Sequence, residues 1–143
     1  MTMKITFTRL TDDRHRLTIV RDDGSSEHGE LETRSFLLHD LTHYALEAEA
    51  KMDRGVWGTR ARGPLPETPT PEIALAERLT APMQSVWQGR LDPDLYVEQA
   101  KGIAPFVDAD FVARVCERLR KLMGHWKATP FRADMVLDWP ASQ

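Results

Sequence analysis

The first third of the chain alternates between polar and apolar residues, which is typical of strands with one buried face. The run 4–10 alternates in this way, and the run 17–21 is rich in β-branched residues. Turn-forming residues separate these runs from each other and from a weaker third strand at 27–33. The sequence therefore predicts an antiparallel β-meander over residues 1–34.

The apolar spacing changes from two residues to the helical period after this meander. Ser35 is a candidate N-cap, and Gly55 is expected to end the helix in a left-handed cap. We therefore expect a helix over residues 35–54. Its apolar stripe consists of Leu37, Leu41, Ala45, Ala48 and Met52.

The rest of the chain divides into a loop, a helical region and a strand. Prolines and glycines between 58 and 71 exclude regular structure and predict an extended loop. Residues 72–127 carry helical periodicity, with Asp92 and Asp108 as N-caps of the second and third helical stretches. Residues 131–139 have strand propensity, and we expect this strand to pair with the meander.

These elements predict the α+β class: a small antiparallel sheet, formed by the meander and the C-terminal strand, packed against about four helices. The length of 143 residues allows one domain, so we expect residues 1–143 to fold as a single unit. A composition of 41% hydrophobic and 29% charged residues is that of an ordinary globular domain.

Charge and cysteine content exclude some classes of function and limit the kind of metal site that the chain can form. The net charge of −3 argues against a general nucleic-acid binder, which needs a surplus of basic residues. No apolar run is long enough to cross a membrane, and the sequence does not open with a charged and then apolar leader, so we expect a cytoplasmic protein. Because Cys116 is the single cysteine, any metal ligands must be histidines and carboxylates.

The candidate chemistry lies on the predicted helix 35–54. His39, His43 and Glu47 follow one another at intervals of four residues, which places them on one face of a helix. We expect this face to lie opposite the apolar stripe and to project away from the main packing side. Both imidazoles can then reach one metal ion, zinc or another divalent cation, with Glu47 as a candidate third ligand.

The run from His39 to His43, His-Asp-Leu-Thr-His, resembles the zincin motif His-Glu-x-x-His, with Asp40 where that family has glutamate. The resemblance implies that His39 and His43 are zinc ligands and that Asp40 is the general base. In that family the third ligand comes from further along the chain. Besides Glu47, the candidates for this position are Glu49, His15, His28 and His125.

A longer stretch resembles an uncharacterised family of small bacterial proteins. The resemblance rests on residues 38–43 together with Glu47 and Glu49, followed by Gly-Val-Trp-Gly at 55–58. It brings no activity with it, but it implies that the helix and the Gly-x-Trp-Gly turn act as one unit. We expect Trp57 to fill the gap between them.

The sequence thus favours a metal-dependent, hydrolase-like protein that activates water and acts on an unidentified small molecule or peptide. The alternative is a non-enzymatic binding module that holds a partner through the Pro-rich loop, with both histidines solvated or hydrogen-bonded to carboxylates. Under either interpretation a homodimer would cover apolar surface left by Met83, Trp87 and Trp126.

Overall fold

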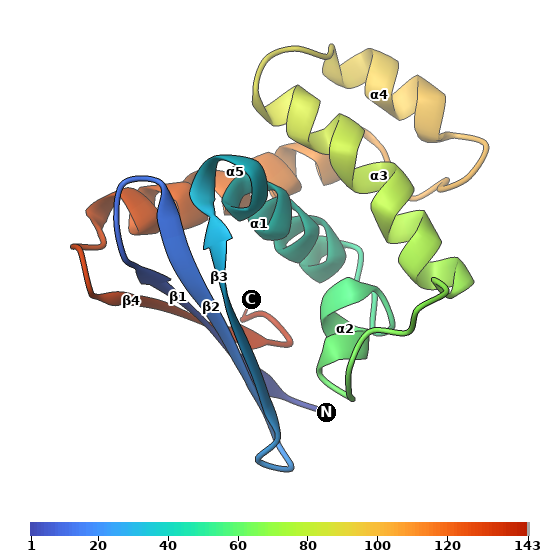
Figure 1. Cartoon of the computed structure of the whole chain (residues 1–143). Helices are drawn as coiled ribbons and strands as arrows, with labels where there is room; N and C mark the ends of the chain where they lie inside the picture. The colour runs from blue at the N-terminus through green and yellow to red at the C-terminus, as the bar shows by residue number, and fades with distance from the viewer. Residues whose placement is uncertain (143) are drawn as a thin grey trace.

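Four strands form one antiparallel sheet in a computed structural model that describes residues 1–142 (Figure 1). Their order across the sheet is β3-β2-β1-β4. The strands are β1 (Met3–Arg9), β2 (Arg14–Arg21), β3 (Ser26–Glu32) and β4 (Asp134–Trp139). The predicted meander and its pairing with the C-terminal strand are both confirmed.

Alternation along β1 explains how the sheet meets the core. Ile5 and Phe7 are fully buried, whereas the residues between and beside them are exposed or partly exposed. Phe7 lies opposite Met135 of β4, which is also fully buried. One face of the sheet is therefore apolar and needs helices to cover it.

Five helices accompany the sheet, which confirms the α+β class. They are α1 (Thr33–Glu49), α2 (Val56–Arg60), α3 (Pro71–Trp87), α4 (Pro93–Ala100) and α5 (Ala109–Ala128). Figure 1 shows α1 and α5 nearest the sheet, with α3 and α4 outside them. Two predicted N-caps are confirmed: Asp92 accepts a hydrogen bond from the backbone of Asp94, and Asp108 accepts one from Phe111. The prediction of Ser35 as an N-cap is wrong, because α1 already begins at Thr33.

Several boundaries differ from the predicted ones. The first helix ends at Glu49 rather than at residue 54, because Lys51 takes the left-handed conformation (φ 55°) and turns the chain early. Gly55 has a φ of −74° and begins α2 instead of ending α1. Because α2 occupies the start of the predicted loop 58–71, the segment between helices covers only residues 61–70.

The C-terminal strand is also shorter than predicted. It begins at Asp134 rather than at residue 131, because residues 131 and 132 form a turn in which Arg132 has a φ of 66°. A strand needs extended backbone, so β4 can begin only after this left-handed residue.

The face of α1 that carries His39, His43 and Glu47 lies away from the apolar stripe, but it too is packed against another helix. Side chains on this face are covered by α3, and His43 and Glu47 are only 3% and 0% exposed. Helix α1 is therefore buried both on its apolar side and on its histidine side.

The surface expected to favour a homodimer is largely absent. Met83 and Trp126 are 0% and 5% exposed, because both belong to the core, and Trp87 is partly buried. Among the described residues, no helix is both long enough and apolar enough to span a lipid bilayer.

Candidate metal centre

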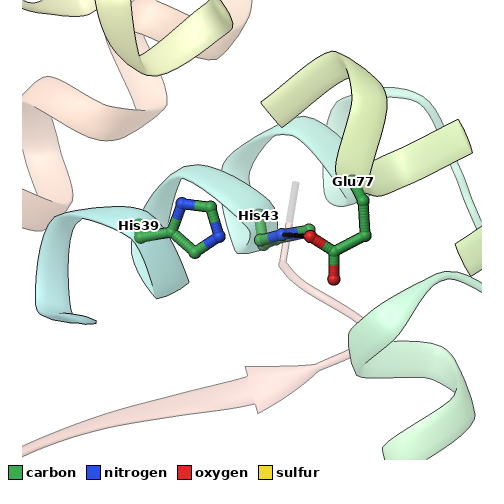
Figure 2. Close-up of side chains that lie close together, drawn as sticks. All are labelled: His39, His43 and Glu77. Atoms are coloured by element: carbon green, nitrogen blue, oxygen red, sulfur yellow. Dashed lines mark ion pairs between the residues drawn. The ribbon is translucent and has the colours of Figure 1, made fainter. Parts of the chain in front are cut away.

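His39 and His43 lie one turn apart on α1, and both rings belong to a group of side chains at the α1–α3 boundary (Figure 2). Their ring centroids are 4.9 Å apart, and the ring planes are nearly perpendicular, at 80°. His43 is buried and His39 is partly buried. The helical spacing of four residues therefore brings the two imidazoles together as predicted.

A third donor comes from α3. His39, His43 and Glu77 each offer one ligand atom, and these three atoms lie within 4.8 Å of one another. Within this group, His43 Nε2 lies 3.3 Å from Glu77 Oε2 (Figure 2). The Glu77 side chain is 51% exposed, so the group is open to solvent on this side.

Glu47, the expected third ligand, lies at the other nitrogen of His43. Its Oε2 is 2.8 Å from His43 Nδ1, and its Oε1 accepts a hydrogen bond of 3.0 Å from the backbone N–H of Trp57. The Glu47 carboxylate is thus fully buried and has a partner for each oxygen. The carboxylate can accept a hydrogen bond from Nδ1 of His43, while Nε2 faces Glu77.

Gly55 provides the space in which the Glu47 carboxylate sits. A Cβ atom at position 55 would lie 2.6 Å from Glu47 Oε1, closer than real Cβ contacts. The same turn supplies the N–H of Trp57, so Gly55 makes room for the carboxylate and Trp57 donates a hydrogen bond to it. Trp57 is 1% exposed, which confirms its expected place in the core.

Two polar residues of α3 complete the surroundings of the histidines. Gln84 Oε1 lies 3.3 Å from Nδ1 of His39. Thr80 Oγ1 lies 3.3 Å from Nδ1 of His43 and donates its own hydrogen bond to the carbonyl of Ala76. Both Nδ1 atoms therefore have oxygen partners within the protein.

Opposing effects act on the pKa of His43. Burial alone would lower this pKa, but the hydrogen bond to Glu47 and the charges of Glu47, Glu77 and Asp40 outweigh it and raise the pKa. The surroundings of His43 therefore favour a positive charge, which a protonated ring or a bound cation would provide.

Asp40, the expected general base, lies partly buried beside the group. Burial raises its pKa to about 6, and the nearby charges of Arg60, His39 and His43 oppose that rise. Its backbone carbonyl accepts a hydrogen bond from Trp57 Nε1 at 3.3 Å. Asp40 therefore lies close enough to both histidines and to Arg60 of α2 for their charges to act on its carboxyl group.

The other expected third ligands lie elsewhere. Glu49 is bound to Arg114 and Arg118 of α5. His15 is buried in the sheet, His28 is exposed on β3, and His125 is exposed in the last turn of α5. None of these four residues belongs to the group of His39, His43 and Glu77.

Sequence reasoning missed the residues that α3 contributes. Glu77, Thr80 and Gln84 are spaced by three and four residues, so they form one polar stripe beside the buried face of α3. This stripe is the signal that could have indicated a polar contact with a second helix. It does not reveal which helix that is.

Comparisons with protein-family models, with curated proteins and with solved structures find no match for this chain. The function is therefore argued from the site itself.

Proposed function

We propose that the chain binds a divalent cation, zinc in the first instance, through His39, His43 and Glu77. We further propose that it hydrolyses a small molecule or peptide at this centre, with Asp40 as general base. The observation that carries the proposal is the convergence of three donors of suitable type from two helices. Two histidines and one glutamate form a ligand set of catalytic zinc sites, which keep a fourth position open.

The spacing of the donors supports this assignment. Two atoms bound to a tetrahedral zinc at about 2.0 Å lie roughly 3.3 Å apart. His43 Nε2 and Glu77 Oε2 are separated by 3.3 Å. Rotation of the partly buried His39 and the half-exposed Glu77 would close the wider spacings of up to 4.8 Å.

The hydrogen bond from His43 to Glu47 also supports it. Histidine ligands commonly donate their second N–H to a carboxylate, which fixes the tautomer and strengthens the ligand. Glu47 makes this contact at 2.8 Å, and its other oxygen is held by the backbone. Under this proposal Glu47 orients a ligand rather than binding the metal itself.

The surroundings also suit hydrolysis. A zinc ion in such a site acidifies a water ligand and polarises a substrate carbonyl. The exposure of Glu77 leaves room for substrate to approach. Asp40 follows His39 directly and lies near both histidines, where it can accept a proton from water.

Zinc titration of the metal-free protein tests the proposal. We expect one zinc per chain and a rise in unfolding temperature on addition of zinc. Glu77→Gln should weaken binding by at least roughly 10-fold, because it replaces a charged ligand with a neutral one. Glu67→Gln, in the exposed stretch 64–70, is the matched control and should bind zinc like the parent protein.

Two outcomes would refute the proposal: no stoichiometric zinc binding, or identical binding by the Glu77→Gln variant. Either would leave His43 as a buried partner of two glutamates with a purely structural role. Zinc-dependent cleavage of simple esters and peptides, lost in Asp40→Asn, then tests the hydrolytic step separately.

The segment 61–70 favours a second candidate function. Residues 64–70 are all exposed, and Leu65 is 44% exposed. A non-enzymatic binding module could hold a partner through this Pro-rich segment. In that case shortening the segment should abolish association with the partner, whereas His39→Ala and His43→Ala should leave it unchanged.

A further inference from the structure

A cavity of about 300 Å³ opens between β3, α1 and α2. Its link to the candidate metal centre is Asp40, which lines the cavity and follows His39 on α1, whereas His39, His43 and Glu77 do not line it. Its size is at the lower end of small-molecule sites. The cavity therefore has room for a small ligand beside Asp40.

Arg60 of α2 provides a positively charged wall of this cavity. The guanidinium side chain is only 17% exposed, and Nε is buried without a hydrogen-bond partner. Its Nη2 is 3.8 Å from Oε1 of Glu27, which is beyond hydrogen-bond distance. Within residues 1–142, no hydrogen bond is donated by the Arg60 guanidinium.

Glu27 and Asp40 interact with Arg60 by charge, but neither accepts a hydrogen bond from it, so its N–H groups can still donate to an added acceptor. A guanidinium has five N–H donors, and burying such donors without acceptors is costly. The Arg60 guanidinium also lies 5.1 Å from the centre of the Trp57 ring, which holds it in place. A planar, fixed guanidinium is suited to bind an oxyanion through two parallel hydrogen bonds.

The other walls restrict the kind of oxyanion. Asp40 and Glu27 line the same cavity and carry negative charge, so a ligand with two negative charges would be repelled more strongly than one with a single charge. Leu17, Leu31 and Phe36 provide apolar surface, and Phe36 is 46% exposed. This combination fits a carboxylate attached to an apolar group better than it fits a phosphate.

We propose that this cavity binds the carboxylate of a small organic acid, with Arg60 as the anchor and Phe36 against the apolar part of the ligand. We also infer that this ligand is the substrate of the neighbouring centre. The second statement rests on the proposed metal-dependent function, whereas carboxylate binding by Arg60 does not.

Binding of 3-phenylpropionate to the metal-free protein, measured by calorimetry or by protein NMR, tests the anchor. We expect saturable binding that weakens by roughly 10-fold or more in Arg60→Gln, as expected for loss of charged hydrogen bonds. The control Arg62→Gln should bind normally, because Arg62 is committed to Asp53 and to the carbonyl of Gly58. Phe36→Ser should also weaken binding.

Two further ligands make the test independent of whether Arg60→Gln folds. The neutral 3-phenylpropanamide should bind the parent protein at least roughly 10-fold more weakly than the acid, because it lacks the charge. Phenyl phosphate should also bind more weakly. Equal binding of acid and amide, tighter binding of the phosphate, or unchanged binding in a folded Arg60→Gln variant would overturn the proposal.

The two proposals fail separately. Zinc titration of Glu77→Gln concerns the metal centre alone, and acid binding without metal concerns the cavity alone. If zinc-dependent ester hydrolysis is found, 3-phenylpropionate should inhibit it in the parent protein and much less in Arg60→Gln. Equal inhibition in both proteins would separate the cavity from the substrate site.

Discussion

Two buried histidines of this protein have opposite surroundings. His43 on α1 is 3% exposed and contacts the carboxylates of Glu47 and Glu77. His15 on β2 is 0% exposed and lies between the rings of Phe7 and Trp126, with both centroids 6.0 Å away. Its Nδ1 has Thr33 Oγ1 at 3.0 Å, and its Nε2 has no partner among the described residues.

The difference shows that burial alone does not distinguish a histidine suited to binding a cation from one suited to packing. Burial lowers the pKa of His15 to about 4, with a smaller contribution from Arg14. At His43 the same effect is outweighed by carboxylates, so the pKa is raised. A neutral ring suits apolar surroundings, whereas a ring held by one carboxylate and facing another has the contacts expected of a cation ligand.

Exchanging each histidine for glutamine should separate these roles most clearly. We expect His43→Gln to weaken zinc binding by at least roughly 100-fold, because a ligand is lost, and His15→Gln to leave zinc affinity unchanged. Calorimetric titration with zinc measures both. Thermal unfolding in the presence of a chelator shows whether each variant folds, and equal zinc affinity of two folded variants would remove the distinction.

The carboxylate behind His43 should have the next largest effect. Glu47→Gln retains the shape of the side chain but weakens the acceptor for His43 Nδ1. We therefore expect zinc affinity to fall by roughly 10- to 100-fold, which is typical for loss of a residue that hydrogen-bonds to a metal ligand. Glu49→Gln is the control, because Glu49 lies two residues away on α1 and binds Arg114 and Arg118. If both variants lose affinity equally, Glu47 has no special part in the site.

Periodicity in the sequence was sufficient to predict the sheet and most of the helices. Alternation in β1 and the helical spacing in α5 each reflect a single buried face. Hydrophobic periodicity detects elements of this kind, because apolar residues recur on one side only. Helix α1 is different, since it is buried on two sides and has polar residues in one of them. Its boundaries and its packing were consequently the least well predicted.

Half of the candidate site could be predicted in the same way. His39 and His43 belong to one helix, where spacing determines proximity. Glu77 lies on α3, and its approach to His43 depends on how two helices pack, which local sequence does not specify. Glu47 has the spacing of a ligand, but the turn at Gly55 and Trp57 holds its carboxylate behind His43.

The glycine that accommodates Glu47 provides a smaller test of the same network. Gly55→Ala places a methyl group 2.6 Å from Glu47 Oε1, so we expect a loss of about 1–3 kcal/mol in the free energy of unfolding and weaker zinc binding. Gly63→Ala is the matched control, since a Cβ there meets nothing within 4 Å. Urea unfolding of the metal-free proteins measures the difference.

The result for Gly55→Ala bears directly on Glu47. A loss of stability without any change in zinc affinity would mean that the carboxylate can move and still hold His43. Equal stability of the Gly55→Ala and Gly63→Ala variants would show that the turn has more room than the structure indicates.

The pH dependence of stability gives the smallest predicted effect and concerns the other histidine. The pKa of His15 is about 4 in the folded protein and near its ordinary value of 6.5 in the unfolded chain, so the unfolded chain takes up the proton first as the pH falls. The stability that His15 contributes is therefore complete above pH 6.5 and declines as the pH approaches 4. Between pH 7 and 5.5 the loss should be about 1 kcal/mol.

Comparison with His15→Gln isolates this contribution from those of other titrating groups. Urea unfolding at both pH values should show a smaller loss in the variant, by about 1 kcal/mol, because glutamine does not titrate. The Phe7 and Trp126 rings around His15 would then be the cause, since they exclude the water that a charged ring needs. An equal loss in both proteins would mean that His15 is solvated after all, and the contrast with His43 would then lie in its carboxylates alone.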